Sequence, residues 1–411
     1  MSKSIWIFNH YAITPDMTGG SRHYDLSKEL VKRGYDVTIF ASSFHYSRYV
    51  ETKLSGDEGW KIETVDGIRF VWLKTPAYQR NDWRRIVNML NYTYRSYHLG
   101  RKITQIMPCI PKPDTIIGST VHLLAVFSAY CIARFYRAKF IMEVRDLWPQ
   151  TLIDIGALSE KALTAKAMYA LEKFLYQKAG RIITLLPLAG EYMVSRGVSN
   201  DKIVWLPNGV DLSRYGTDRE TRTTSNGHFK MLYLGAHGRV NALDNLIDAA
   251  HIVQDRGYEG IQLIFVGDGP EKPGLIKHKE KLNLKNVEFH DSIPKSEVPG
   301  LIASVDACLV TLLDLGLYKY GLSFNKIFDY LAAGKPIIMG GSPVNDIIKD
   351  ADCGFSVPPD DSNALANAMI ALYEMSAEER LAMGRRGRGY VEKYHDTKVL
   401  AERLIGCVEA N

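Results

Sequence analysis

The sequence contains little cysteine and no long uninterrupted apolar run. Its five cysteines lie far apart and form no Cys-x-x-Cys pair, so neither a zinc site nor a disulfide framework is indicated. No apolar run approaches the roughly 18 residues that a membrane-spanning helix needs, and no signal peptide is visible. We therefore expect reduced thiols and a protein that is soluble or peripherally attached to a membrane.

The excess of positive charge is small. The chain has 51 basic and 46 acidic residues, a net charge of +5, which suits anionic small molecules or a membrane surface and is too weak to indicate nucleic-acid binding. Hydrophobic residues make up 46% and charged residues 24% of the sequence, as in ordinary globular proteins. A length of 411 residues favours two domains.

Strand and helix patterns alternate along the first half of the chain. The apolar segment 4–12 predicts a strand, 21–34 has helical spacing and ends at a glycine, and 35–42 predicts the next strand. This is a βαβ unit, which indicates a parallel sheet. Further predicted strands follow at 114–120, 139–144, 181–186 and 201–211.

A second βαβ series begins after a polar stretch at about residue 215, which we interpret as a linker or long loop. Predicted strands at 229–235, 261–269, 286–293, 307–313 and 335–341 alternate with helices. Two Rossmann-like halves of about equal length are therefore expected, and the segment from about residue 376 is expected to be helical.

Glycine-rich turns follow several predicted strands. Gly19-Gly20 closes the first strand-to-helix loop, where a backbone without side chains can approach a phosphate at a helix N-terminus; simple turn glycines are the alternative. In Leu232–Arg239, Arg239 either pairs with a diphosphate or is solvated. Val266–Pro270 ends a strand in an acidic turn at a sheet edge where α/β folds bind ligands. Pro207–Asp211 indicates only a tight turn.

The helix predicted within Ser323–Ile338 carries a lysine and an acid near its start. Ser323 or Asn325 can cap it, and Lys326 would stand at its positive end beside phosphate oxygens. Asp329 is one turn further on, so both would share a face. Such a pair would suit a nucleotide, with the lysine contacting a phosphate and the carboxylate contacting the ribose. The alternative is an intrahelical Lys–Asp pair.

Two further segments combine charged and aromatic residues. Arg145 and Asp146 follow a strand, where they either face the ligand crevice or form a surface pair. In 76–102, apolar side chains recur at helical spacing among arginines, which fits a helix in a membrane interface; packing on its own sheet is the alternative. The apolar residues are Trp83, Ile86, Val87, Leu90, Tyr94 and Tyr97, and the arginines are Arg84, Arg85, Arg95 and Arg101.

The chain resembles the retaining glycosyltransferases of family 4 over essentially its whole length. The resemblance is carried by TGGSRHYDLSKELVKRGYDVT, PNGVD, YLGAHGR, VGDGP and FNKIFDYLAAGKPII. The EVRDLWP and GLSFNKIFDYLAAGKPII versions resemble a bacterial subgroup that builds O-antigen, capsule or colanic-acid-type polysaccharide, including fucosamine transferases.

This resemblance implies an α/β protein with the GT-B fold, in which two facing Rossmann-like domains form a catalytic cleft. The acceptor-binding domain would span 1–206, with the helix at about 390–411 packing back onto it, and the nucleotide-sugar-binding domain would span 207–389. The donor would be a UDP-sugar and the acceptor a lipid-linked sugar, with no metal or other cofactor. A cytoplasmic location, peripheral on the inner membrane, is expected.

Site residues can be carried over by position. Asp329 would hold the ribose, Arg239 and Lys326 would neutralise the diphosphate, and Asp146 and His122 are candidates for orienting a sugar. The expected donor-binding residues are Gly19, Gly20, Gly235, His237, Gly267, Asp268, Gly269, Gly321, Leu322, Ser323, Asn325 and Asp329.

Two positions depart from the family pattern. Gly321 stands where the first acid of the paired-acid motif belongs, so backbone around Gly321–Ser323 would have to meet the donor sugar. Asn241 and Ala242 stand where a lysine is usual, and Lys326 would compensate. Two alternatives stay open: a UDP-sugar 2-epimerase, which shares the fold and the donor site but needs no acceptor, and a non-catalytic nucleotide-sugar-binding subunit, which Gly321 in place of the acid favours.

Overall fold

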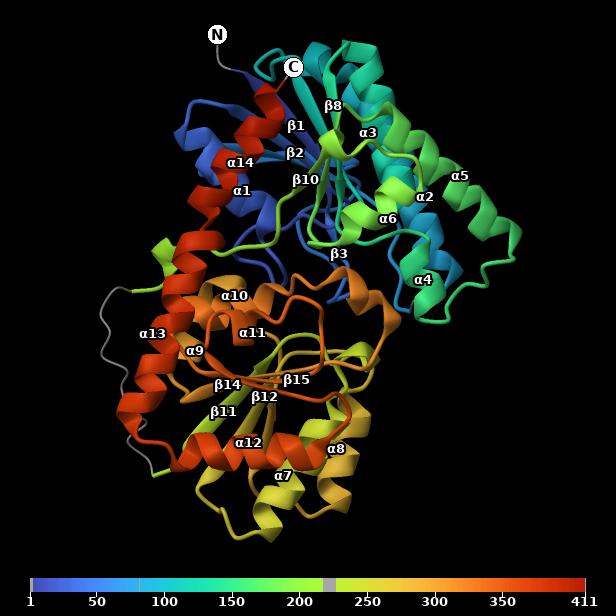
Figure 1. Ribbon diagram of the computed structural model, residues 1–411. Coiled ribbons are helices and arrows are strands. Elements are labelled where there is room, and N and C mark those ends of the chain that lie inside the picture. Colours follow the sequence, from blue (N-terminus) through green and yellow to red (C-terminus); the bar gives the residue numbers. More distant parts are fainter. Residues whose placement is uncertain (1–2, 81, 217–226, 411) are drawn as a thin grey trace. The chain divides into compact units, whose positions relative to one another are not determined.

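The computed structural model describes residues 3–80, 82–216 and 227–410, so most of the linker expected near residue 215 lies outside the described residues. The chain forms two compact units (Figure 1). The N-terminal unit comprises residues 1–14, 20–207 and 397–411, and the C-terminal unit comprises residues 15–19 and 208–396.

The N-terminal unit is built on a sheet with the strand order β10-β9-β8-β7-β1-β2-β6-β5. All neighbouring strands are parallel except β5 and β6. The strands are β1 (Ser4–Phe8), β2 (Asp36–Ser42), β5 (Trp60–Val65), β6 (Ile68–Leu73), β7 (Thr115–Ser119), β8 (Lys139–Val144), β9 (Arg181–Thr184) and β10 (Ile203–Trp205). A separate short ribbon pairs β3 (Phe44–His45) with β4 (Val50–Glu51).

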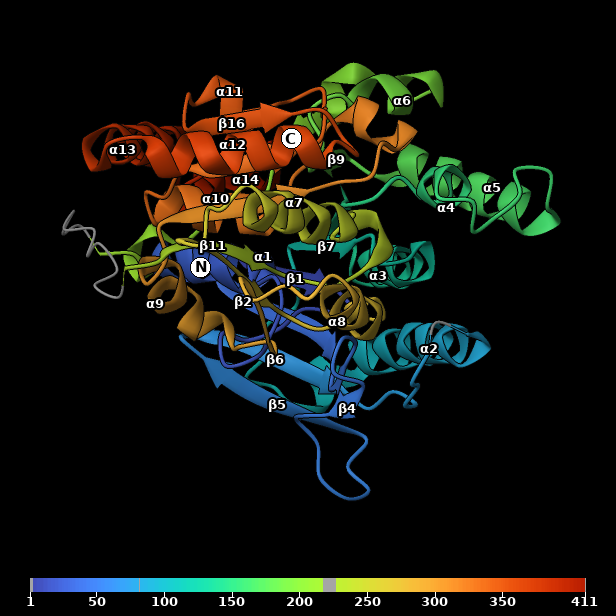
Figure 2. The same ribbon diagram turned by 90° about the horizontal axis from the view of Figure 1, so that it is seen from below.

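The antiparallel hairpin of β5 and β6 is absent from the predicted strands. Figure 2 shows it at the edge of the sheet. Asp66 and Gly67 join the two strands, with φ angles of 49° and 80°, and an Asp-Gly pair with positive φ at both positions is the turn that hairpins favour. The sequence therefore contained a signal for this hairpin that the βαβ interpretation overlooked.

Helices cover both faces of this sheet. Figure 1 shows α1 and α14 on one side and α2, α3 and α5 on the other, and α14 packs against α1. The helices are α1 (Arg22–Lys32), α2 (Trp83–Ile106), α3 (Leu123–Tyr136), α4 (Gln150–Asp154), α5 (Leu163–Lys178), α6 (Ala189–Ser195) and α14 (Thr397–Glu409). Thus the C-terminal helix belongs to the N-terminal unit.

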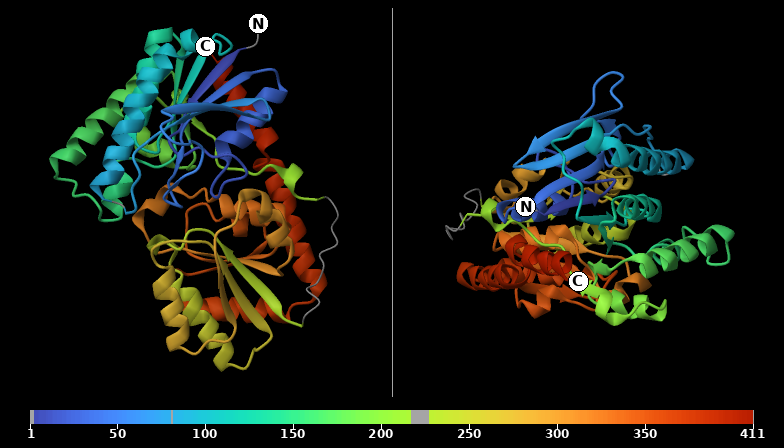
Figure 3. Two further views of the ribbon diagram at one scale, coloured as in Figure 1. Left: turned by 180° about the vertical axis from the view of Figure 1, so that it is seen from behind. Right: turned by 90° about the horizontal axis from the view of Figure 1, so that it is seen from above.

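The C-terminal unit has an all-parallel sheet in the order β13-β12-β11-β14-β15-β16. The strands are β11 (Phe229–Leu234), β12 (Ile261–Val266), β13 (Val287–His290), β14 (Ala307–Thr311), β15 (Ile337–Gly340) and β16 (Gly354–Val357). Figure 3 shows this sheet from behind. The parallel sheets predicted for both halves are confirmed.

Two hydrophobic layers enclose this sheet because successive side chains of a strand point to opposite faces. Leu232 and Leu234 pack with α9, α10 and α11, whereas Met231 and Tyr233 pack with α7, α8 and α12. The helices are α7 (Asp244–Asp255), α8 (Lys272–Lys281), α9 (Val298–Ala303), α10 (Asn325–Ala332), α11 (Ile347–Asp350), α12 (Ser362–Glu374) and α13 (Ala377–Tyr394). Within the residues described, no helix is both long and apolar enough to span a membrane.

Candidate active site

Glycines at the carboxyl ends of β11 and β12 allow two loops to pack backbone against backbone. Gly267 and Gly269 have φ angles of 147° and 158°. A Cβ atom on Gly267 would lie 1.9 Å from the carbonyl oxygen of Gly235, and one on Gly269 would lie 2.3 Å from that of His237. These glycines are therefore required by loop packing alone, and their predicted contact with a nucleotide stays a prediction.

Asp268, between these glycines, has its carboxylate engaged within the unit. Its Oδ1 lies 3.2 Å from the ammonium of Lys272, and its Oδ2 accepts a hydrogen bond from the Ser292 backbone N–H at 3.1 Å. Lys272 also contacts Asp291 at 2.7 Å. Asp268 thus ties the end of β12 to the loop that follows β13.

Lys326, in the first turn of α10, reaches across to the end of β11. Its ammonium lies 2.8 Å from the hydroxyl of Tyr233 and 4.1 Å from the centroid of the Tyr233 ring. Its distance to Oδ1 of Asn241 is 3.5 Å, and no carboxylate is recorded beside it in the described part of the chain. Loss of solvent lowers the pKa of Lys326 to about 7.

The loop after β11 adds two more basic side chains. His237 is fully buried, and neither ring nitrogen has a hydrogen-bond partner among the described residues. Burial, together with Lys272, lowers the pKa of His237 to about 4, so the ring is neutral at pH 7. Arg239 is exposed at the start of η3 (Arg239–Asn241). Lys326 thus supplies a cation beside Asn241, where the family pattern has a lysine.

Asp329 points to a different set of partners. Its Oδ1 accepts a hydrogen bond from the Tyr215 hydroxyl at 2.8 Å, and its Oδ2 lies 2.5 Å from the ammonium of Lys295. Lys326 and Asp329 therefore contact separate elements, and their joint use of one face to bind a nucleotide stays a prediction. The intrahelical Lys–Asp pair does not form.

The start of α10 also differs from the prediction. The N-cap residue is Phe324, which has no capping side chain, so capping by Ser323 or Asn325 is wrong. The Ser323 hydroxyl instead accepts a hydrogen bond from the backbone N–H of Asn208 at 2.8 Å. The tight turn 207–211 is therefore fastened to the loop that precedes α10.

The backbone around Gly321 is largely occupied. Asn345 accepts from the N–H of Leu322 at 2.7 Å and donates to its carbonyl oxygen at 2.9 Å. The side chain of Asn208 donates to the carbonyl oxygen of Ser323 at 2.5 Å. Asn208 and Asn345 were not identified from the sequence as organisers of this turn. Asn208 lies between Pro207 and Gly209, where an asparagine signals only a turn, and no local pattern singles out Asn345.

In the N-terminal unit, a buried polar network joins the carboxyl ends of three strands. Asn9 donates to Ser119 at 2.9 Å, and Ser119 donates to Glu143 at 2.6 Å. Arg22 and His23, at the start of α1, contact the same carboxylate at 2.9 and 2.7 Å. Burial alone would raise the pKa of Glu143, but His23 and Arg22 hold it well below its usual range.

His122 is the N-cap of α3. Its Nδ1 accepts a hydrogen bond from the Ala125 backbone N–H at 3.1 Å, so its proton is on Nε2, 3.1 Å from Nδ1 of His10. Burial, aided by Arg85, lowers the pKa of His122 to about 3. His122 is thus a neutral imidazole of fixed tautomer. Asp146 lies exposed beyond β8.

The glycine pair of the first loop is divided between the units. Gly19 is grouped with the C-terminal unit and Gly20 with the N-terminal unit. Gly19 has a φ of 129°, which favours glycine. Their expected approach to phosphates stays a prediction. In the described part of the chain, no group of three or more His, Cys, Asp or Glu side chains is placed to hold a metal ion.

Two family models match this chain, one in each half. Residues 18–209 match the model described as "Glycosyl transferase 4-like domain", and residues 228–375 match "Glycosyl transferases group 1". Probable glycosyltransferase WbjE of Pseudomonas aeruginosa is 22% identical over 304 residues, covering 72% of this chain and 74% of WbjE.

Solved structures show the same fold. Sucrose-phosphate synthase of Thermosynechococcus elongatus has a TM-score of 0.73 at 18% identity over 98% of each chain. Anabaena HepE in complex with UDP-glucose has a TM-score of 0.68 at 13% identity over 98% of each chain. WaaG, described as a glycosyltransferase involved in lipopolysaccharide biosynthesis, has a TM-score of 0.65 at 14% identity, covering 99% of this chain and 100% of WaaG.

The two Rossmann-like sheets and these matches define a glycosyltransferase of the GT-B class. The chain belongs to family 4 of these enzymes, the family that its sequence motifs resemble.

Proposed function

We propose that this protein transfers a sugar from a UDP-sugar to a polyprenyl-diphosphate-linked sugar, with retention at the anomeric carbon and without a metal, in the synthesis of a bacterial surface polysaccharide. The observation that carries this proposal is Lys326, a partly desolvated ammonium beside the β11 loop with no carboxylate recorded next to it in the described residues. A cation that lacks an anionic partner is suited to an anionic ligand.

The chemistry follows from the leaving group. Cleavage of the sugar–phosphate bond develops negative charge on the diphosphate, and a cation already in place stabilises that charge without reorganisation. Lys326 is held by Tyr233 and Asn241, whereas Arg239 is exposed and can adjust its guanidinium fork to a bound diphosphate. The acceptor hydroxyl would attack the anomeric carbon from the face that the diphosphate departs from and lose its proton to a phosphate oxygen of that leaving group, which gives retention.

The donor and pathway are supported by relatives. HepE was solved with UDP-glucose and WaaG is described as acting in lipopolysaccharide biosynthesis. At these low identities the likeness shows the fold alone, so UDP and the polysaccharide role are parts of the proposal. Gly321 removes an acidic side chain from the expected donor-sugar site, which favours a deoxy or N-acetylated sugar with fewer hydroxyls to recognise.

A lipid-linked acceptor is supported by α2. This helix packs inward through a stripe of mostly small or polar residues, whereas its large apolar side chains face outward. The outward residues are Trp83, Ile86, Val87, Leu90 and Tyr94, which are 65, 59, 40, 50 and 63% exposed. Exposed apolar residues flanked by arginines are typical of a surface that contacts anionic lipid. The N-terminal unit would thereby contact the inner membrane from the cytoplasmic side.

A screen of UDP-sugars against polyprenyl-diphosphate sugars, read by mass spectrometry, tests the proposal. We expect one donor to give a glycosylated lipid with the purified chain alone and with chelator present. An epimerised UDP-sugar without acceptor would indicate an epimerase instead. Nucleotide binding without any product would indicate a non-catalytic subunit, and no nucleotide binding would refute the proposal.

A further inference from the structure

The carboxylate of Asp329 is fixed by two side chains from other parts of the C-terminal unit. Tyr215 follows η2 (Leu212–Arg214) and Lys295 begins η4 (Lys295–Glu297). Their contacts of 2.8 and 2.5 Å use one carboxylate oxygen each. Asp329, Tyr215 and Lys295 are only 4, 5 and 9% exposed, so this is a buried ion pair with an additional hydrogen bond.

The geometry leaves acceptor capacity on Asp329. An ionised carboxylate offers about four lone-pair sites, of which the recorded contacts with Tyr215 and Lys295 use two. Two vicinal hydroxyls, such as those of a ribose, can therefore bind the same carboxylate without displacing either partner.

Lys295 is the cation recorded in contact with this carboxylate. Lys326 lies on the same helix but contacts Tyr233, and Arg388 on α13 donates to the carbonyl oxygen of Ala332 at the end of α10. Tyr330, the next residue of α10, accepts from the backbone N–H of Leu234 at 2.8 Å. Removal of Lys295 would therefore leave the buried carboxylate of Asp329 without the cation that holds its Oδ2 in place.

We propose that Lys295 is a positioning residue of the donor site, which together with Tyr215 holds and aims the carboxylate of Asp329 so that its free lone pairs bind the ribose hydroxyls of the nucleotide. This inference rests on the proposed function. It assigns to Lys295 a role through Asp329 and no direct contact with the donor.

The test compares UDP with 2′-deoxy-UDP by isothermal titration calorimetry. We expect the wild-type protein to prefer UDP by about 10- to 150-fold, the value of one hydrogen bond to a charged group. In Lys295→Met this preference falls toward unity. Lys295→Arg, which keeps the positive charge, restores it.

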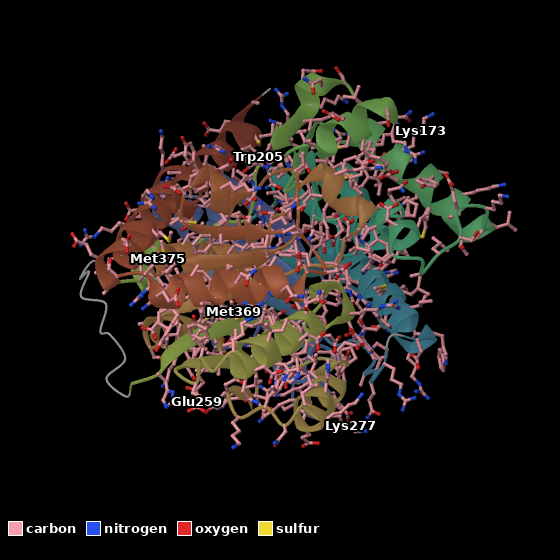
Figure 4. All side chains as sticks on the ribbon, turned by 60° about the horizontal axis from the view of Figure 1, so that its bottom comes forward. Lys173, Trp205, Glu259, Lys277, Met369 and Met375 are labelled. Carbon is pink, nitrogen blue, oxygen red and sulfur yellow. The ribbon has the colours of Figure 1, made fainter. Side chains whose placement is uncertain are left out.

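Two controls separate positioning from a general structural effect. Lys277→Met removes an exposed lysine that projects outward from α8 (Figure 4), and it should leave the preference for UDP unchanged. In an Asp329→Asn background, Lys295→Met should cause no further loss of UDP affinity, because its effect passes through the missing carboxylate. Thermal melting confirms that each variant is folded.

The outcomes distinguish this inference from the proposed function. If the wild-type protein does not bind UDP, the proposed function fails. If the wild-type protein binds UDP but Lys295→Met keeps its preference over 2′-deoxy-UDP, or weakens both ligands equally in either background, the positioning role is refuted. If Lys295→Met does not fold, Lys295→Arg decides instead, measured alone and in the Asp329→Asn background. Because Lys295→Arg keeps the positive charge, loss of its preference for UDP over 2′-deoxy-UDP would contradict the inference.

Discussion

Binding of a nucleotide diphosphate should add a proton to Lys326. Loss of solvent lowers the pKa of this lysine to about 7 from 10.5, so in the free protein at pH 8 only about a tenth of the molecules carry the charge. A diphosphate favours the charged form. At pH 8 we therefore expect uptake of nearly one proton per UDP bound, and about half a proton at pH 7.

The contribution of Lys326 to UDP binding should decrease as the pH rises. Protonating Lys326 before it can pair with the diphosphate costs about 1.4 kcal/mol at pH 8, and this cost grows as pH rises further. A hydrogen bond between charged groups contributes about 1.5–3 kcal/mol. Lys326→Met should therefore weaken UDP binding by about 10- to 150-fold at pH 7, and by less at pH 9.

The same pKa shift affects folding. Because the folded-state pKa of Lys326 is depressed below that of the unfolded chain, the unfolded state binds more protons between about pH 7 and 10.5. Stability of the wild-type protein should rise with pH through this window relative to Lys326→Met. Below pH 7 the difference between the two proteins should be constant.

Calorimetry in two buffers of different ionisation enthalpy measures the proton uptake directly. Lys326→Met is the matched control, since protons taken up by UDP itself occur in both proteins and cancel. Lys326→Arg, which stays charged, should bind UDP without this uptake. Equal uptake by the wild-type protein and Lys326→Met would refute the reasoning, as would equal UDP affinities.

Three further predictions concern other parts of the chain. Glu172 is buried, and burial raises its pKa to about 7 despite hydrogen bonds from Tyr176 and Tyr192. Because a raised acid pKa costs stability as the pH rises from 4.5 to 7, Glu172→Gln should be more stable than the wild-type protein at pH 8, by at most about 3 kcal/mol. An equal difference in stability at pH 4.5, measured by denaturant titration, would contradict this. Gly267→Ala should lower the free energy of unfolding by about 1–3 kcal/mol or more, because it introduces a Cβ where φ is 147° and a carbonyl oxygen would lie 1.9 Å away. Gly274→Ala on α8 is the control: a Cβ there would have no atom from another part of the chain within 4 Å, so this substitution should be neutral or stabilising. Serine at Trp83 and Leu90, two exposed residues of α2, should reduce flotation with anionic vesicles at unchanged melting temperature, and undiminished flotation would exclude α2 as the contact surface.

Local sequence patterns determined most of the architecture. Alternation of buried strands with amphipathic helices is set by short-range periodicity, so both parallel sheets and α10, with its end at Gly334, could be predicted. Gly34 and Gly334 mark helix ends because a left-handed residue terminates a helix without a Cβ penalty, and both have positive φ. The Asp-Gly hairpin was equally local and was missed only because the βαβ pattern was given precedence.

Side-chain partners were decided by the tertiary structure. Lys326 and Asp329 are three residues apart on one helix, and their spacing predicted a shared face. Yet Lys326 contacts Tyr233 on β11, whereas Asp329 contacts Lys295 on η4. Lys295 itself is separated from Asp329 by 34 positions, a distance over which no periodicity acts. The sequence by itself determined which elements form and which residues bear charge, because those are properties of single residues and their neighbours in the chain. The tertiary structure alone decided which charged side chains contact each other, because it brings the ends of non-adjacent strands to the same edge of the sheet.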